Sequence, residues 1–81
     1  MTPDQELDAC DMLCPLPVLK ARKRLLAMQE GQVLRVLTTD PVAPIDLPLF
    51  CLQSGHDYIG ATEDGTTIEG ATVHLIRRGK D

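Results

Sequence analysis

A pair of prolines set directly before a long amphipathic run is the feature that most restricts how this chain can fold. Pro15 and Pro17 lack a backbone N–H group, so they fit the first turn of a helix and almost no later position. From Pro15 to about Gln29 the apolar side chains recur at helical spacing; they are Val18, Ala21, Leu25 and Met28, with Leu19 and Leu26 widening the stripe. The pattern predicts a helix that packs on a sheet, with Cys14 as its N-cap residue.

The rest of the chain predicts strands and one further helix. Alternating and β-branched runs indicate strands at residues 6–9, 32–38, 58–62 and 71–77. A second, shorter helix is expected to run through Leu52 and stop at Gly55; Asp40 is a candidate N-cap, but Pro44 and Pro48 leave its starting point open. The segment 67–69 could add a short extension between the last two strands. The order βαβαββ predicts an α/β (α+β) fold, a two-layer sandwich with two helices on one face of a four-stranded mixed sheet.

Length and composition limit what the fold can do. The chain has 81 residues, so residues 1–81 are expected to form one small domain. It has no Trp and only Phe50 and Tyr58 as aromatic residues, so the core must be aliphatic and no aromatic platform for stacked bases is available. A net charge of −4 argues against nonspecific binding to nucleic acid or to an anionic membrane.

The sequence gives no sign of membrane insertion or export. No apolar run is long enough to span a bilayer, and residues 1–8 lack the basic start and apolar core of a signal peptide. We therefore expect a cytoplasmic protein, and a small acidic domain of this kind is expected to be mainly monomeric.

The chain contains three cysteines, Cys10, Cys14 and Cys51. An odd number of cysteines in a reducing compartment favours metal binding or reactive thiols over a disulfide framework. A zinc site is weakly supported, because there is no CxxC motif and His56 and His74 do not lie at finger-like spacing from the cysteines. His56 is expected to be a cap or surface residue, and His74 an ordinary strand residue.

Cys14 is the candidate reactive group. A thiol at a helix N-terminus faces unpaired N–H groups and the positive end of the helix dipole, and both favour the thiolate and a lowered pKa. The same helix carries a cluster of basic residues: Lys20, Arg22, Lys23 and Arg24. On position alone the alternative stays open that Cys14 is an inert capping residue beside a solvated basic face.

The motif around Cys14 adds a family resemblance. Cys14-Pro15-Leu16-Pro17 is a CPxP motif, and further matches follow in order at residues 8–9, 18–24, 39–41, 46–51 and 55–57. With these residues the chain resembles the TusA/SirA family of small sulfur-carrier proteins. The resemblance implies a fold similar to the C-terminal domain of translation initiation factor 3 and a persulfide carried on Cys14, with Pro15 and Pro17 fixing the helix start.

The chain departs from the family pattern next to the motif. Asp11 stands where the family usually has glycine, and Met12 where it usually has leucine. Asp is among the residues that best tolerate a left-handed backbone, although at some cost. An inward-pointing carboxylate there would also raise the pKa of the Cys14 thiol.

The resemblance implies transient protein partners. Cys14 would take sulfur from a donor such as a cysteine desulfurase or a rhodanese-like enzyme and pass it to an acceptor protein. The protein would be a carrier rather than a multi-turnover enzyme. Thiolate attack on a persulfide needs no metal or organic cofactor. The basic cluster would then dock on an acidic partner surface.

The other two cysteines leave alternatives open. Cys10 could attack a Cys14 persulfide and form a disulfide, provided that the two residues lie close together. Cys51 is expected to be a packed, inert thiol. Two competing functions therefore remain: a regulatory or interaction module in which Cys14 only caps the helix, and a thiol redox switch that uses Cys10 and Cys14.

Overall fold

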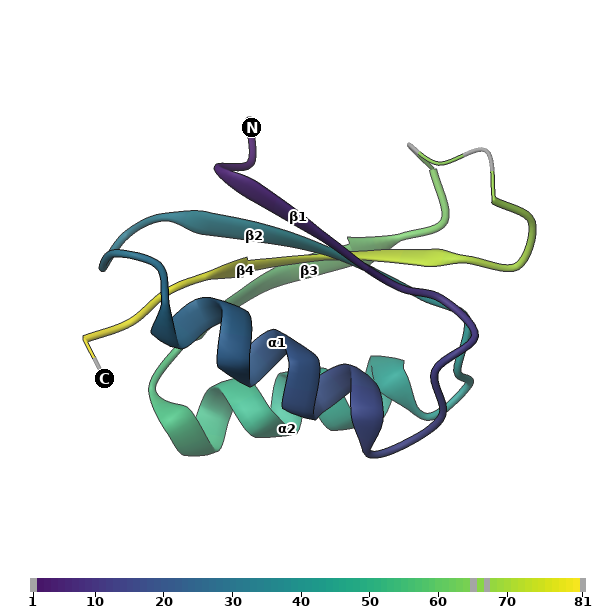
Figure 1. Ribbon diagram of the computed structural model, residues 1–81, viewed down its shortest axis with the longest axis horizontal. Coiled ribbons are helices and arrows are strands. Elements are labelled where there is room, and N and C mark those ends of the chain that lie inside the picture. Colours follow the sequence, from purple (N-terminus) through teal and green to yellow (C-terminus); the bar gives the residue numbers. More distant parts are fainter. Residues whose placement is uncertain (1, 65, 67, 81) are drawn as a thin grey trace.

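The computed structural model describes residues 2–64, 66 and 68–80. Figure 1 shows a sheet with both helices beneath it, in the predicted order βαβαββ. The elements are β1 (Gln5–Ala9), α1 (Leu16–Leu26), β2 (Val33–Thr38), α2 (Ala43–Ser54), β3 (Asp57–Thr62) and β4 (Thr72–Arg77).

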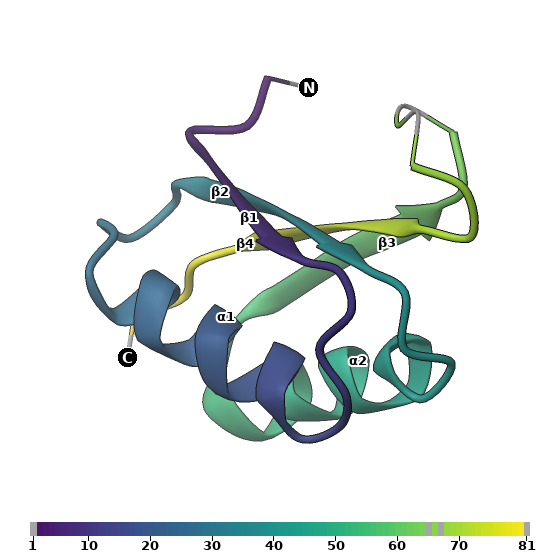
Figure 2. The ribbon, with the colours of Figure 1, turned by 45° about the vertical axis from the view of Figure 1, so that its right-hand side comes forward.

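The sheet is mixed, as predicted. Its strand order is β1-β2-β4-β3; β1 pairs with β2 in parallel, and the other neighbours are antiparallel. Both helices cover the same face of the sheet (Figures 1 and 2). Because β1 and β2 are parallel, with Ala9 opposite Thr38, the connections to α1 and α2 both leave from the carboxyl ends of these strands, at the same end of the sheet. The candidate site lies at this end.

The core between the two layers is aliphatic, as the composition requires. Leu25 of α1 and Leu47 of α2 pack with Leu34, Val36 and Ile76 of the sheet, and all five are fully buried. Burying each such side chain stabilises the fold by roughly 1.5–3 kcal/mol relative to leaving it exposed. The helical spacing therefore predicted the burial of Ala21 and Leu25 in α1 correctly, and Met28, just beyond the helix, is buried as well.

Helix α1 differs from the prediction in its length and in the width of its stripe. It ends at Leu26, because Ala27 and Met28 donate to the carbonyls of Arg24 and Leu25 in a tightened last turn. Leu19 and Leu26 are each 52% exposed. The expectation that these two leucines widen the buried stripe was wrong.

Helix α2 begins later than Asp40 and is not the shorter of the two helices. It has 12 residues and α1 has 11, so the expectation of a shorter second helix was wrong. Asp40 does not begin the helix, because its side chain and its carbonyl accept hydrogen bonds from Val42 and Ala43 in a preceding turn. Gly55 ends the helix in a left-handed conformation with φ 77°, as predicted.

The connection between β3 and β4 is only partly described. Residue 67, the first of the expected extension at 67–69, lies outside the described residues. Ile68 and Glu69 lie in a turn that is closed by a hydrogen bond from Ala71 N–H to the Ile68 carbonyl. These two residues therefore form no strand.

Both histidines are more buried than the sequence suggested. His56 was expected to be a cap or a surface residue. It is buried against Phe50, so it is not a surface residue, but its backbone N–H donates to the Cys51 carbonyl at 3.0 Å at the end of α2, as a capping residue would. Its Nδ1 atom also accepts a hydrogen bond from Gly79 N–H. His74 is fully buried, and its Nε2 and Nδ1 atoms each lie 2.8 Å from a hydroxyl oxygen, those of Thr38 and Tyr58. His74 thus joins three strands through a polar group inside the core.

Candidate functional site

Cys14 lies in the connection between β1 and α1, where its side chain is exposed. Two hydrogen bonds hold the start of this loop: Asp11 N–H donates to Thr39 Oγ1 at 2.8 Å, and Met12 N–H donates to the Ala9 carbonyl at 3.3 Å. Asp11 has φ 65°, the left-handed conformation that the glycine usual at this position would favour. Met12 packs against the core. Asp11 therefore adopts the left-handed backbone conformation that glycine adopts readily.

Cys14 is not the N-cap of α1. Leu16 N–H donates to the Leu13 carbonyl at 2.9 Å and closes a turn, within which the Cys14–Pro15 peptide bond is cis. The helix begins after this turn, with Pro15 as its N-cap and Pro17 in its first turn. The predicted capping role was wrong because the sequence pattern does not reveal the turn. The prolines still frame the helix start.

Two carboxylates from the α2 side of the site accept hydrogen bonds from Cys14. The Cys14 N–H donates to Asp40 Oδ2 at 2.9 Å, and the thiol Sγ donates to Asp46 Oδ2 at the same distance. Asp40 is buried in the turn before α2, and Asp46 lies half-buried in the first turn of that helix. The site thus joins the start of α1 to the start of α2, as the neighbouring loops in Figure 2 indicate.

The electrostatics of the site are opposite to those expected. The hydrogen bond to Asp46 raises the pKa of the Cys14 thiol, and desolvation and the negative charges of Asp46 and Asp40 act in the same direction. The expected lowering was wrong because the thiol points at a carboxylate rather than at free helical N–H groups. A negative acceptor opposes formation of a second negative charge beside it.

Sequence reasoning missed the role of Asp46 toward Cys14. The two residues are 32 positions apart, and no local pattern indicates that their side chains meet. Asp46 does belong to the segment 46–51 that carries part of the family resemblance, which was the only available signal. Asp40 was singled out, but as a helix cap rather than as a partner of Cys14.

The other two cysteines lie in different environments. Cys10 is half-buried, and burial together with Asp8 raises the pKa of its thiol to about 11. Cys51 is buried in α2, and burial raises the pKa of its thiol to about 12. The expectation that Cys51 is packed in the core is confirmed. All three cysteines are free thiols, and Cys14 is the exposed one.

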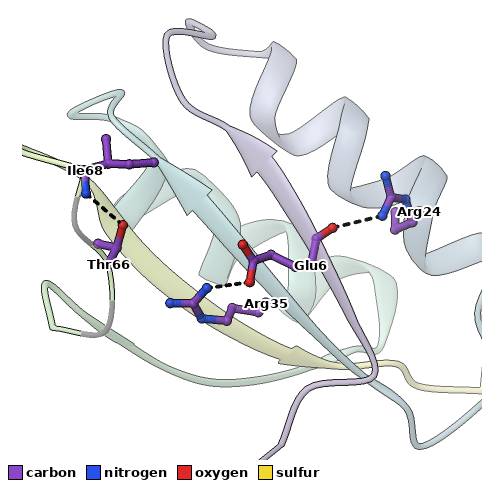
Figure 3. A network of polar contacts seen from close by, with 5 residues as sticks. All are labelled: Glu6, Arg24, Arg35, Thr66 and Ile68. Carbon is purple, nitrogen blue, oxygen red and sulfur yellow. Dashed lines mark hydrogen bonds and ion pairs between the residues drawn. The ribbon is translucent and has the colours of Figure 1, made fainter.

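The basic cluster on α1 divides into two parts. Lys20, Arg22 and Lys23 are exposed. Arg24 is half-buried, and its guanidinium donates to the Glu6 carbonyl at 3.1 Å (Figure 3). Arg24 therefore ties α1 to β1, and the three exposed residues present the positive charge of this helix.

Exposed apolar side chains lie next to Cys14 along the chain and on α2. Leu13 and Leu16 are its neighbours along the chain, and α2 carries the exposed row Ile45, Leu49 and Leu52 at helical spacing. We call these five residues the apolar rim. Exposed apolar side chains are common at protein docking sites.

Neither a metal-ligand cluster nor a membrane-spanning helix is present in the described part of the chain. Residues 2–64, 66 and 68–80 contain no cluster of three or more His, Cys, Asp or Glu residues able to hold a metal ion. None of the helices in the same ranges has the length and apolar character needed to cross a bilayer.

The fold and the site define a small two-layer domain whose available chemistry is that of one surface thiol, Cys14, set in a CPxP turn. The family model of sulfurtransferase TusA matches residues 5–78, and the chain belongs to this family. That assignment agrees with the resemblance seen in the sequence.

Individual relatives agree with the family. The chain is 48% identical over 62 residues to the sulfur carrier protein TusA of Allochromatium vinosum, a match that covers 76% of this chain and 82% of that protein. Among solved structures, it is similar to a SirA-like protein from Desulfitobacterium hafniense, with a TM-score of 0.78 and 25% identity. That similarity covers 94% of this chain and 99% of the other.

Proposed function

We propose that this protein is a sulfur carrier in which Cys14 bears the sulfur as a persulfide. The observation that carries the proposal is that Cys14, in the CPxP turn, is the exposed thiol of the three. Family membership and the similarity to a protein named as a sulfur carrier support it. The protein acts as a single domain, residues 1–81, in the cytoplasm, and carries one sulfur atom at a time rather than turning over a substrate.

Sulfur transfer to Cys14 is a thiol–persulfide exchange. The Cys14 thiol loses its proton to solvent, and the thiolate attacks the outer sulfur of a donor persulfide. A sulfur–sulfur bond forms on Cys14 as the bond within the donor persulfide breaks, and the donor cysteine leaves as a thiolate. Onward transfer repeats the exchange, with the acceptor thiolate attacking and Cys14 leaving. Neither step requires a metal or an organic cofactor.

A loading experiment tests the proposal. The protein is incubated with a cysteine desulfurase and cysteine, or with polysulfide, and its intact mass is measured. We expect the mass of one added sulfur atom, removable by a reductant and placed on Cys14 by peptide mapping. Sulfur found on Cys51, or no loading from either source, would contradict the carrier function and favour an interaction module.

The surface around Cys14 fits transient docking to a donor and an acceptor. The apolar rim lies next to Cys14 along the chain and on the exposed side of α2, and Lys20, Arg22 and Lys23 add exposed positive charge on α1. Apolar contacts supply affinity, while charge complementarity mainly raises the association rate. A donor such as a cysteine desulfurase or a rhodanese-like enzyme would present an acidic surface next to its persulfide.

Charge reversal on α1 is expected to slow sulfur transfer. Arg22→Glu combined with Lys23→Glu replaces attraction by repulsion toward an acidic partner, and should lower the transfer rate at low salt by about tenfold or more. Both side chains are exposed, so the fold should remain intact. The rate is measured over a salt series.

The control for this variant is Arg77→Glu combined with Lys80→Glu, which makes the same change in net charge. Arg77 is the last residue of β4, and Lys80 follows that strand. We expect this control to transfer sulfur at nearly the wild-type rate. Equal rates for both double variants, with the same salt dependence, would reject docking through α1.

Cys10 is expected to have little influence on a persulfide at Cys14. Attack on the persulfide requires the Cys10 thiolate, and a pKa raised to about 11 leaves little thiolate at neutral pH. Cys10→Ser should therefore change the persulfide lifetime by less than about twofold, as followed by mass spectrometry. A much longer lifetime, with loss of a Cys10–Cys14 disulfide seen in the wild type, would support the redox switch instead.

A further inference from the structure

The thiol of Cys14 is held by a side chain from the opposite helix. Its Sγ donates to Asp46 Oδ2 at 2.9 Å, while the backbone N–H of the same cysteine donates to Asp40 Oδ2 at 2.9 Å. The backbone contact fixes the position of Cys14, and the side-chain contact fixes the direction of the thiol. Asp40 is buried, whereas Asp46 is only half-buried and can be reached from the surface.

The charged groups that act on the thiol share one sign. They are Asp46 in the first turn of α2 and Asp40 in the turn before that helix, and both raise the pKa of Cys14. The basic residues Lys20, Arg22 and Lys23 lie on α1, more than one turn beyond the cysteine in sequence. The thiolate is the nucleophile. A carboxylate that accepts a hydrogen bond from the thiol stabilises the protonated form, so it lowers the fraction of Cys14 present as thiolate.

We propose that Asp46 is a positioning residue that holds the Cys14 thiol in a hydrogen bond and thereby slows its reactions in the free protein. The hydrogen bond and its effect on reactivity do not depend on the proposed function. Only their purpose rests on it, which is to protect a sulfur-accepting thiol between encounters with partner proteins. Attack on a donor persulfide then begins when the hydrogen bond to Asp46 breaks and the thiol proton leaves to solvent.

Alkylation of Cys14 tests this role without any sulfur chemistry. The rate of reaction with iodoacetamide is measured between pH 6 and pH 10 for the wild type, Asp46→Asn and Asp46→Glu, with the modified cysteine identified by peptide mapping. We expect Asp46→Asn to react faster at pH 7. Each unit by which the Cys14 pKa falls raises the thiolate fraction about tenfold but lowers the nucleophilicity of the thiolate, so the rate should rise by about threefold per unit. The midpoint of its rate–pH profile should move to lower pH.

Two further variants separate positioning from a general structural effect. Asp46→Glu keeps the carboxylate, so its profile should lie closer to the wild type than that of Asp46→Asn. Asp57→Asn removes a carboxylate at the start of β3 and should leave the profile unchanged. Thermal unfolding monitored by circular dichroism establishes that each variant is folded.

An unchanged or slower rate in Asp46→Asn would overturn the proposal, and a slower rate would make Asp46 a proton acceptor that assists attack. If that variant does not fold, Asp46→Ser is measured in its place, since a serine side chain carries no charge. A faster reaction and a lower midpoint than in the wild type support the proposal, and an unchanged or slower rate overturns it. Failure of the wild type to load sulfur would instead reject the proposed function and leave the alkylation result valid.

Discussion

Replacing Cys14 with serine is expected to abolish sulfur loading and leave the fold intact. A serine hydroxyl can still donate to Asp46, and the backbone N–H of residue 14 can still donate to Asp40, so the contacts at the site persist. The hydroxyl does not provide a thiolate at neutral pH, so loading should fall to background. Intact mass after exposure to a desulfurase and cysteine measures the loss, and urea unfolding measures the stability.

Single replacements of the other two cysteines are the controls for this result. Cys10→Ser and Cys51→Ala should still load one sulfur atom. Cys51 is buried, so an alanine there avoids placing a hydroxyl in the apolar core. Substantial loading of Cys14→Ser would show that another thiol accepts sulfur and that the exposed cysteine of the CPxP turn is not the carrier.

The fold was predictable because local signals agreed along the chain. The helical spacing of Ala21, Leu25 and Met28 and the β-branched run of β2 identified their elements, and Gly55 ended α2 as expected. Each of these signals involves residues close together in sequence. At that range the geometry of a helix, a strand or a turn is enough to relate the residue pattern to the element it forms.

The geometry of the site was less predictable because it depends on contacts between distant segments. The sequence pattern predicts Cys14 as a helix cap, but the hydrogen bond from Leu16 N–H to the Leu13 carbonyl places it in a turn, and its thiol donates to Asp46. The hydrogen bond to Asp46 is the largest of several effects, all of which raise the pKa of the Cys14 thiol. Neither the turn nor the distant carboxylate has a local sequence signal.

Exposed apolar residues caused a second class of error. Leu19 and Leu26 fit the helical stripe as well as core residues do, and the sequence cannot distinguish an apolar side chain that faces the core from one on the surface. His74 is the converse case, a polar residue at a core position of β4. Its alternation with Ile76 places both on the same face, but its partners Thr38 and Tyr58 come from two other strands.

Acidification below about pH 6.5 is expected to destabilise the protein through His74. Burial lowers the pKa of this histidine from 6.5 to about 4, so the unfolded chain binds a proton more readily than the folded protein. The contribution to stability is complete above the unfolded pKa and is lost as pH falls toward the folded value. Each pKa unit corresponds to about 1.4 kcal/mol, which gives a loss of about 2–3 kcal/mol by pH 4.5.

This loss is large for a domain of such size, because small folds are stable by only about 5–15 kcal/mol. The free energy of unfolding is measured by urea denaturation at pH 7.5 and at pH 4.5, the lower value being chosen to limit protonation of ordinary carboxyl groups. His74→Gln supplies the comparison, since an amide can hydrogen bond to the hydroxyls of Thr38 and Tyr58 but does not titrate.

The two proteins should therefore respond differently to pH. The wild type is expected to lose about 2–3 kcal/mol of unfolding free energy between the two pH values, and His74→Gln to lose much less, even if it is less stable at pH 7.5. Equal losses in both would assign the acid sensitivity to carboxyl groups rather than to His74. No loss in the wild type would mean that the folded protein accommodates a charged imidazole between Thr38 and Tyr58, whose hydroxyl oxygens can each accept a hydrogen bond from it.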